Sequence, residues 1–313
     1  MSTPGRRASP SSADAVDWRG SALFVALAFG VAWSVWIGLR ALGVPFAARV
    51  PIGMYAPAVA AVAVRLLRGE GFADAGLRVS RTGRLDRSYL YAYLVPPLAL
   101  AAGLLIALGS GFQHWALATN IHQLEQSVVQ QAGGQKPNLP PGMSLEQFFN
   151  LLIPIELVAA LTVAPIINAL FAFGEEFGWR GYLLPRLGPL GQFQAAILVG
   201  VIWGLWHAPV IVQDGYNFPG HPWLGVGGMV LFTVAASLVF AWLRFRSDSV
   251  FPSTLAHGAL NAQAGFVVLA LSRTDSLLGA PVGLVGVVPF AAFAAWLVAS
   301  ARLSRHATSN GTR

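Results

Sequence analysis

The sequence predicts an all-α fold, a polytopic membrane helix bundle with about eight transmembrane helices and both termini in the cytoplasm. Three observations predict it. Apolar residues make up 55% of the 313 positions and charged residues only 11%, whereas soluble domains carry ~25% charged residues. The apolar residues gather in long runs. Arginine is concentrated in alternate connections between those runs. A soluble globular protein is therefore excluded.

Each apolar run is close to the ~20 residues that a helix needs to cross the hydrocarbon core. The hydrocarbon core holds no water to pair the backbone N–H and C=O groups, so a spanning segment must be a helix or a strand of a closed barrel. The runs lack the alternation of apolar and polar residues that barrel strands show, so only helices fit them. The predicted spans are 21–39, 51–67, 88–108, 151–174, 193–213, 224–243, 251–271 and 279–299.

The positive charges predict the orientation, since short cytoplasmic loops retain Lys and Arg. With the N-terminus inside, 16 of the 20 Lys and Arg residues fall on the cytoplasmic side, and only Arg40, Arg49, Lys136 and Arg273 fall outside. The net charge of +7 is thus explained by topology, and no nucleic-acid partner is expected.

We divide the chain into a disordered tail at 1–19, one bundle at 20–301 with its functional core at about 148–272, and a tail at 302–313.

The long external segment at 109–147 is expected to begin with an amphipathic surface helix. Trp115, Ala118, Ile121, Leu124 and Val128 recur at helical spacing, which is typical of a helix lying on the membrane surface. An irregular loop, GGQKPNLPPGMS, follows.

Ionisable residues inside a bilayer are costly, so the few present point to function. The fourth span ends in FGEEFGWRGY at 173–182. Helical spacing places Glu176 over Arg180 and turns Glu175 elsewhere, which leaves Glu175 free to act as a base. We expect this helix to continue past Glu176 toward Tyr182. The alternative is an interfacial ion pair with a second carboxylate at a helix end.

The fifth span places Trp203 and His207 on one face, with Pro209 bending or breaking the helix just beyond. Gly200 and Gly204 form a small-xxx-small pair that predicts close helix packing. A single histidine in a membrane helix is equally consistent with a hydrogen-bonded packing residue.

The seventh span places His257 and Asn261 on one face, and together they supply two directed donors. The alternative is an interhelical hydrogen-bond pair, worth ~0.6–2 kcal/mol. Glu156, about 28 Å from Glu175 along the fourth span at 1.5 Å per residue, is interpreted as an outer-boundary residue. The combination of acids, imidazoles and amide on three apolar helices favours a functional site.

These motifs resemble those of the CPBP family of intramembrane proteases, which includes the CAAX prenyl endopeptidases and the Abi-type immunity proteins. The pattern EExxxR is matched by Glu175, Glu176 and Arg180, and HxxxN by His257 and Asn261. The pattern FxxxH is matched at His207, with Trp203 in place of the usual phenylalanine.

The resemblance implies peptide-bond hydrolysis in a membrane protein or lipidated peptide, near the cytoplasmic side of the cell membrane. It implies that Glu175 and His207 activate water, that His257 and Asn261 hold the oxyanion, and that Glu176 and Arg180 orient the site. Family members are often classed as metalloproteases, and Glu175, His207 and His257 could then bind a divalent metal such as zinc. The HExxH spacing is absent, so we favour water activated by glutamate without committing to a cofactor.

Two other functions fit the same residues. A proton-coupled transporter would use the acids and histidines as a relay. A catalytically silent immunity or scaffold protein would keep the motif without turnover.

Overall fold

The computed structural model describes residues 15–131 and 139–303, and their regular secondary structure is helical. The prediction of an all-α membrane bundle is confirmed. The helices of the first half are α1 (Trp18–Ala41), α2 (Phe46–Met54), α3 (Ala56–Leu67), α4 (Arg87–Gly109), α5 (Leu117–Gln131) and α6 (Leu145–Ala160). Those of the second half are α7 (Ala164–Gly178), η2 (Trp179–Leu183), α8 (Leu184–Leu187), η3 (Gly188–Leu190), α9 (Gln192–Trp206), α10 (Ala208–Asp214), α11 (Pro222–Ser247), α12 (Phe251–Ala270) and α13 (Leu284–Ala299).

Within the described residues, five helical segments are long and apolar enough to cross a membrane, or six if one bent pair counts as a span. They are Trp18–Ala41, Phe46–Leu67, Arg87–Gly109, Gln192–Asp214 and Pro222–Ser247, with the bent pair Leu145–Ala160 and Ala164–Leu190. The run at 251–271 forms the 20-residue helix α12, and the run at 279–299 forms a helix of only 16 residues, α13. The count of eight spans remains a prediction.

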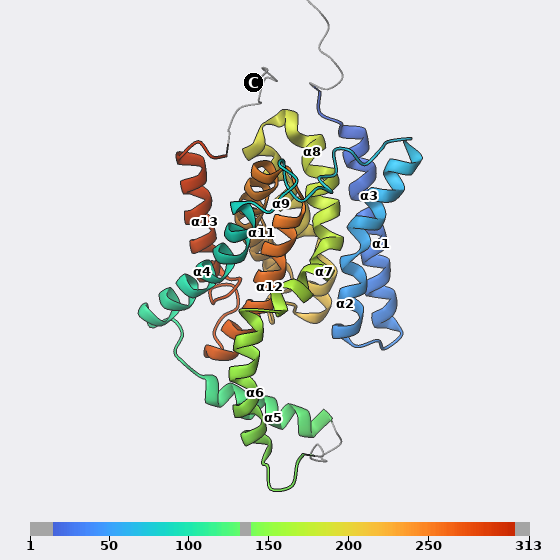
Figure 1. Cartoon of the computed structure of the whole chain (residues 1–313). Helices are drawn as coiled ribbons and strands as arrows, with labels where there is room; N and C mark the ends of the chain where they lie inside the picture. The colour runs from blue at the N-terminus through green and yellow to red at the C-terminus, as the bar shows by residue number, and fades with distance from the viewer. Residues whose placement is uncertain (1–14, 132–138, 304–313) are drawn as a thin grey trace, which may run out of the picture.

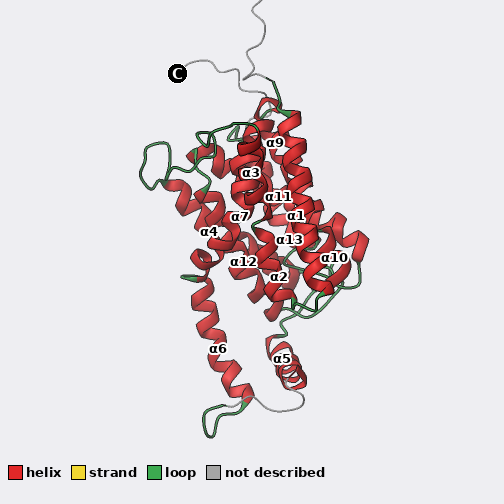
Figure 2. Ribbon diagram, turned by 90° about the vertical axis from the view of Figure 1, so that its right-hand side faces the viewer, coloured by secondary structure: helices red, strands yellow, loops and turns green. Residues whose placement is uncertain are grey.

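The fourth predicted span is not one straight helix, because α6 and α7 meet at a 62° bend. Pro165 starts α7 in the first turn, where its missing N–H and fixed φ suit a helix start. The inference that Glu156 and Glu175 share one helix was therefore wrong. Glu156 is exposed on α6, which projects with α5 beyond the other helices (Figures 1 and 2). Helix α5 confirms the helical part of the external segment; half of the loop predicted after it, residues 133–138, lies outside the described residues.

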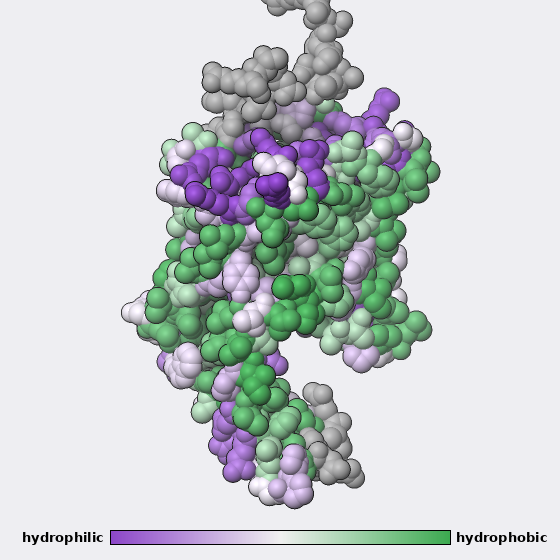
Figure 3. All heavy atoms as spheres, in the orientation of Figure 1, coloured by the Kyte–Doolittle hydropathy of each residue, from purple (hydrophilic) through white to green (hydrophobic). Residues whose placement is uncertain are grey.

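One end of the bundle, here called the arginine-rich end, carries the loop 68–86, the turn 188–191 and the connection 248–250. Arg186 binds Glu70 and Asp74, and Val250 N–H donates to the Gly76 carbonyl at 2.9 Å. Figure 3 shows a hydrophilic band there. Helix α1 begins and α13 ends at this same end (Figure 1). The opposite end, here called the loop end, carries 42–45, 215–221 and 271–283.

Glycines bring the central helices into backbone contact. A Cβ on Gly200 or Gly204 would overlap the backbone of α11, which confirms the predicted close packing. A Cβ on Gly258 would overlap the backbone of α7 at Pro165 and Ala169. This contact holds α12 against α7 and thereby sets the distance between their polar side chains.

Candidate active site

The two glutamates of α7 point in different directions, as the sequence predicted. Arg180 Nη1 donates to Glu176 Oε1 at 2.9 Å, and both side chains are 0% exposed. The helix continues past Glu176 through a π-helical turn, Trp179–Leu183, a feature that often occurs at functional sites. Glu175 instead lines a cavity. The prediction that this helix extends toward Tyr182 is confirmed.

Trp203 of α9 contacts most of the site. Its indole Nε1–H donates to Glu175 Oε2 at 2.6 Å. The Arg180 guanidinium lies over its ring, 4.8 Å from the centroid, in a cation–π contact. The ring centroids of His207 and His257 lie 6.0 and 5.2 Å from that of Trp203. The residue that departs from the family pattern therefore orients the proposed base.

His207 stands at the junction between α9 and α10. The break predicted near Pro209 is confirmed, with Pro209 in the first turn of the new helix. The His207 Nδ1 lies 2.9 Å from the Trp203 carbonyl oxygen. Because a carbonyl only accepts, Nδ1 carries the proton and Nε2 of the neutral ring is an acceptor.

His257 is held by Glu176. Its Nδ1 lies 3.0 Å from Glu176 Oε1, the same oxygen that accepts from Arg180. One turn later on α12, Asn261 is exposed to the cavity, and its carboxamide forms no hydrogen bond with another described residue. The structure thus places His257 and Asn261 on one wall, and it adds a Glu176–His257 contact that the sequence did not predict.

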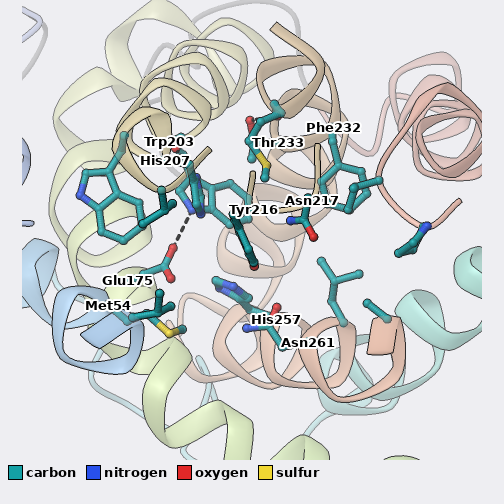
Figure 4. A pocket seen from close by; sticks show the side chains of 18 of the residues that line it. Met54, Glu175, Trp203, His207, Tyr216, Asn217, Phe232, Thr233, His257 and Asn261 are labelled. Carbon is teal, nitrogen blue, oxygen red and sulfur yellow. Dashed lines mark hydrogen bonds between the residues drawn. The ribbon is translucent and has the colours of Figure 1, made fainter. Parts of the chain in front are cut away.

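A cavity of about 350 Å³ collects these groups (Figure 4). Glu175, His207, His257 and Asn261 line it, whereas Glu176 and Arg180 lie behind its wall. The remaining lining is mainly apolar and aromatic, with Trp36, Met54, Trp203, Trp206, Met229 and Phe232 among its members.

Sequence reasoning missed two lining residues, Tyr216 and Asn217, on the connection between α10 and α11. The Tyr216 ring stacks on His207, with the centroids 6.2 Å apart. Burial, together with the negative charge of Glu175, raises the pKa of Tyr216 above its ordinary value of 10.0, so its hydroxyl remains a donor. The only sequence signal was the turn at Gly215, which precedes both residues and has φ +68°.

A divalent metal does not fit the residues well. In the described part of the chain, no three His, Asp or Glu side chains are grouped closely enough to hold one ion. Glu176, which also accepts from Arg180, already occupies the Nδ1 side of His257, and Asn is a poor zinc ligand. We therefore derive no step through a metal.

Residues 154–263 match the family model described as type II CAAX prenyl endopeptidase Rce1-like. The chain carries an Rce1-like segment. Within that segment lie all six motif residues, Glu175, Glu176, Arg180, His207, His257 and Asn261. The chain is also 32% identical, over 93 residues, to a CAAX prenyl protease 2 from Methanococcus maripaludis. That alignment covers 28% of this chain and 34% of the relative. The resemblance to the CAAX protease family is confirmed for this part of the multi-pass membrane protein.

Proposed function

We propose that this protein is an intramembrane endopeptidase of the cell membrane that hydrolyses a peptide bond in a membrane-associated protein or lipidated peptide. One observation carries the proposal. A carboxylate, two imidazoles and a carboxamide from three separate helices line one cavity, as a hydrolytic site requires.

Glu175 acts as the general base. Trp203 holds Glu175 Oε2, which leaves the other carboxylate oxygen for a water molecule. Glu175 removes one proton from this water, with Nε2 of His207 as a second acceptor beside it. The water oxygen bonds to the substrate carbonyl carbon. The proton then passes to the departing amine nitrogen as the C–N bond breaks, so that atoms and charges balance. General-base catalysis of this kind contributes about 10²–10⁴-fold.

His257 and Asn261 stabilise the oxyanion that forms on the carbonyl oxygen. Asn261 donates directly. His257 donates from Nε2 only as an imidazolium, because its Nδ1 already bonds to Glu176. The Glu176 carboxylate oxygen that contacts this Nδ1 also accepts a hydrogen bond from Arg180. Donors fixed in a water-excluded site stabilise developing charge far more than they would in water.

The deciding experiment is mass spectrometry of membrane peptides from cells that express the native protein, Glu175→Gln or Glu156→Gln. The control carries the same substitution at an exposed glutamate on α6, away from the cavity. We expect cleavage products to disappear only in Glu175→Gln, with membrane insertion unchanged. Normal cleavage by Glu175→Gln would refute the role of Glu175 as the base, and an absence of cleavage products with the native protein would favour a transporter or scaffold.

Metal dependence is tested on purified protein. We propose that Glu175 activates the water without a metal, so chelator-treated protein with no metal by elemental analysis should keep its activity. Loss of activity that zinc restores would replace this part of the mechanism.

A further inference from the structure

The cavity lies in one half of the bundle. Helix α12 begins at the arginine-rich end, where Val250 bonds to Gly76. The α12 residues that line the cavity run from His257 to Val268, which is away from that end. At 1.5 Å per residue, Val268 lies about 16 Å farther along the helix axis than His257.

The other helices agree with α12. Helices α1 and α9 run from the arginine-rich end toward the loop end, and they line the cavity only with late residues, Trp36 of α1 and Trp203 and Trp206 of α9. Helix α11 runs in the opposite direction and contributes early residues, Met229 to Thr233. Each of these helices lines the cavity with the half that lies nearer the loop end.

Toward the arginine-rich end the cavity is closed. Trp203, Glu175 and His257 are each at most 4% exposed. Behind them Glu176, Arg180, Phe240 and Trp179 are all 0% exposed. This layer of buried side chains lies between the cavity and the arginine-rich end.

Toward the loop end the cavity continues. A second hollow, of about 480 Å³, shares Asn217, Val268, Pro281 and Val282 with the first. It extends to Arg273 and Ser276 in the segment 271–283. The two hollows together form a path from Glu175 to the loop end.

The arginines are concentrated at the end of the bundle opposite to the one at which the cavity opens. Of the 15 arginines in the described ranges, Arg180 is buried at the site and only Arg40, Arg49 and Arg273 lie at the loop end. The other 11 lie at the arginine-rich end, namely Arg19, Arg65, Arg68, Arg78, Arg81, Arg84, Arg87, Arg186, Arg244, Arg246 and Arg302. Such an excess is typical of the cytoplasmic side.

Two expectations from the sequence therefore conflict. Charge predicts that the arginine-rich end is cytoplasmic, whereas the family resemblance implies a cytoplasmic active site. The cavity opens at the other end, so both cannot hold. We propose that the site opens to the non-cytoplasmic side of the membrane. The identity of the substrate class rests on the proposed function. The substrate is then a polypeptide segment held at the outer leaflet rather than the lipidated terminus of a cytoplasmic protein.

The native chain has no cysteine, so single-cysteine variants of the full-length protein can report access. Leu42→Cys and Leu85→Cys form a matched pair, because the two leucines are 78% and 76% exposed at the loop end and the arginine-rich end, respectively. Val268→Cys, at a residue 58% exposed and shared by both hollows, reports the mouth of the cavity. The probe is a membrane-impermeant maleimide added to intact cells, then to permeabilised cells.

We expect Leu42→Cys and Val268→Cys to be labelled in intact cells, and Leu85→Cys only after permeabilisation. The reverse pattern would overturn the proposal. So would a Val268→Cys that resists labelling in both preparations, because a water-filled mouth must admit the reagent.

Activity provides a separate readout. With the cleavage assay above, maleimide added outside intact cells should abolish cleavage by Val268→Cys and leave Leu42→Cys active. Labelling does not depend on catalytic turnover. A protein that is labelled as expected but shows no cleavage would therefore support this access route and contradict only the proposed function. A blocked mouth with undiminished cleavage would overturn the access route.

Discussion

The ion pairs between acids and arginines at the arginine-rich end and those at the candidate active site differ in redundancy. At the arginine-rich end, Arg186 reaches Asp17, Glu70 and Asp74, while Asp17 and Glu70 also bind Arg68. The acid side chains there are 22–47% exposed. At the site, one oxygen of the fully buried Glu176 serves both Arg180 and His257.

The difference indicates where a charged residue can be substituted without a large loss of stability. An exposed network can lose one member, since water and neighbouring charges compensate. A buried pair leaves an unpaired charge in a low dielectric when one partner is removed. The arginine-rich end therefore tolerates substitution, whereas the Glu176–Arg180–His257 group requires all its members.

The largest effect is expected for Arg180→Leu. Removing the guanidinium strands the Glu176 charge, so the free energy of unfolding in detergent should fall by about 3–5 kcal/mol. The control Arg78→Leu removes an arginine that is 52% exposed and pairs with Asp248, and it should cost ~0–1 kcal/mol. If Arg180→Leu yields no folded protein, Arg180→Lys, which keeps the charge, should recover much of the stability. Equal losses for Arg180→Leu and Arg78→Leu would refute the contrast.

Asn261→Ala should lower kcat by about 10²–10³-fold, the usual effect of losing one oxyanion donor. Stability should change little, because the carboxamide is exposed in the cavity and bonds to no other described residue. Asn261→Asp should be at least as inactive, since a carboxylate repels the oxyanion. A full rate with either variant would remove Asn261 from the mechanism. Single-turnover cleavage of a peptide substrate measures these rates.

Trp203→Phe should have a smaller effect. It restores the usual family residue but removes the hydrogen bond to Glu175. A hydrogen bond to a charged group is worth ~1.5–3 kcal/mol, so we expect kcat to fall about 10–100-fold with KM nearly constant. Trp296→Phe, at a tryptophan on α13 that is 46% exposed, should match the native protein. A change confined to KM would make Trp203 a substrate contact instead of a positioning residue.

The smallest effect is expected from acid at the arginine-rich end. Burial alone would raise the pKa of Asp74, but the hydrogen bond from Arg65 and the charges of Arg65 and Arg186 lower it below 3.8. Asp74 therefore adds stability above its unfolded pKa, and this contribution is lost as the pH falls through the lower folded value. Unfolding midpoints at falling pH should show a slope below about pH 4 that Asp74→Asn reduces. An unchanged slope in Asp74→Asn would assign the acid sensitivity to other groups.

The sequence was enough to predict the fold class, the six motif residues and the directions of Glu175 and Glu176, because apolar run length and helical periodicity are local properties. It also predicted the break beside His207, since proline acts on its own helix. The roles of these residues remain a proposal.

Other features depended on contacts between distant residues. The 62° bend before α7 lies inside the predicted span 151–174, and the apolar composition of that run alone does not locate it. The bond from His257 to Glu176 requires α12 to touch α7 at Gly258, and no single-helix pattern encodes that approach. Tyr216 and Asn217 reach the cavity from a connection whose path depends on the whole bundle.

The junction at His207 is held by more than the Rce1-like segment. Trp33 of α1 donates to the Trp206 carbonyl at 3.0 Å, and Asp214, at the far end of α10, binds Arg40 and Arg49. Trp36, Val50 and Met54 supply one side of the cavity. All of these partners except Trp206 and Asp214 precede residue 154. The smallest fragment that can hold the imidazoles of His207 and His257 in their observed positions is therefore longer than residues 154–263. Excising residues 154–263 would separate this segment from the residues that position it.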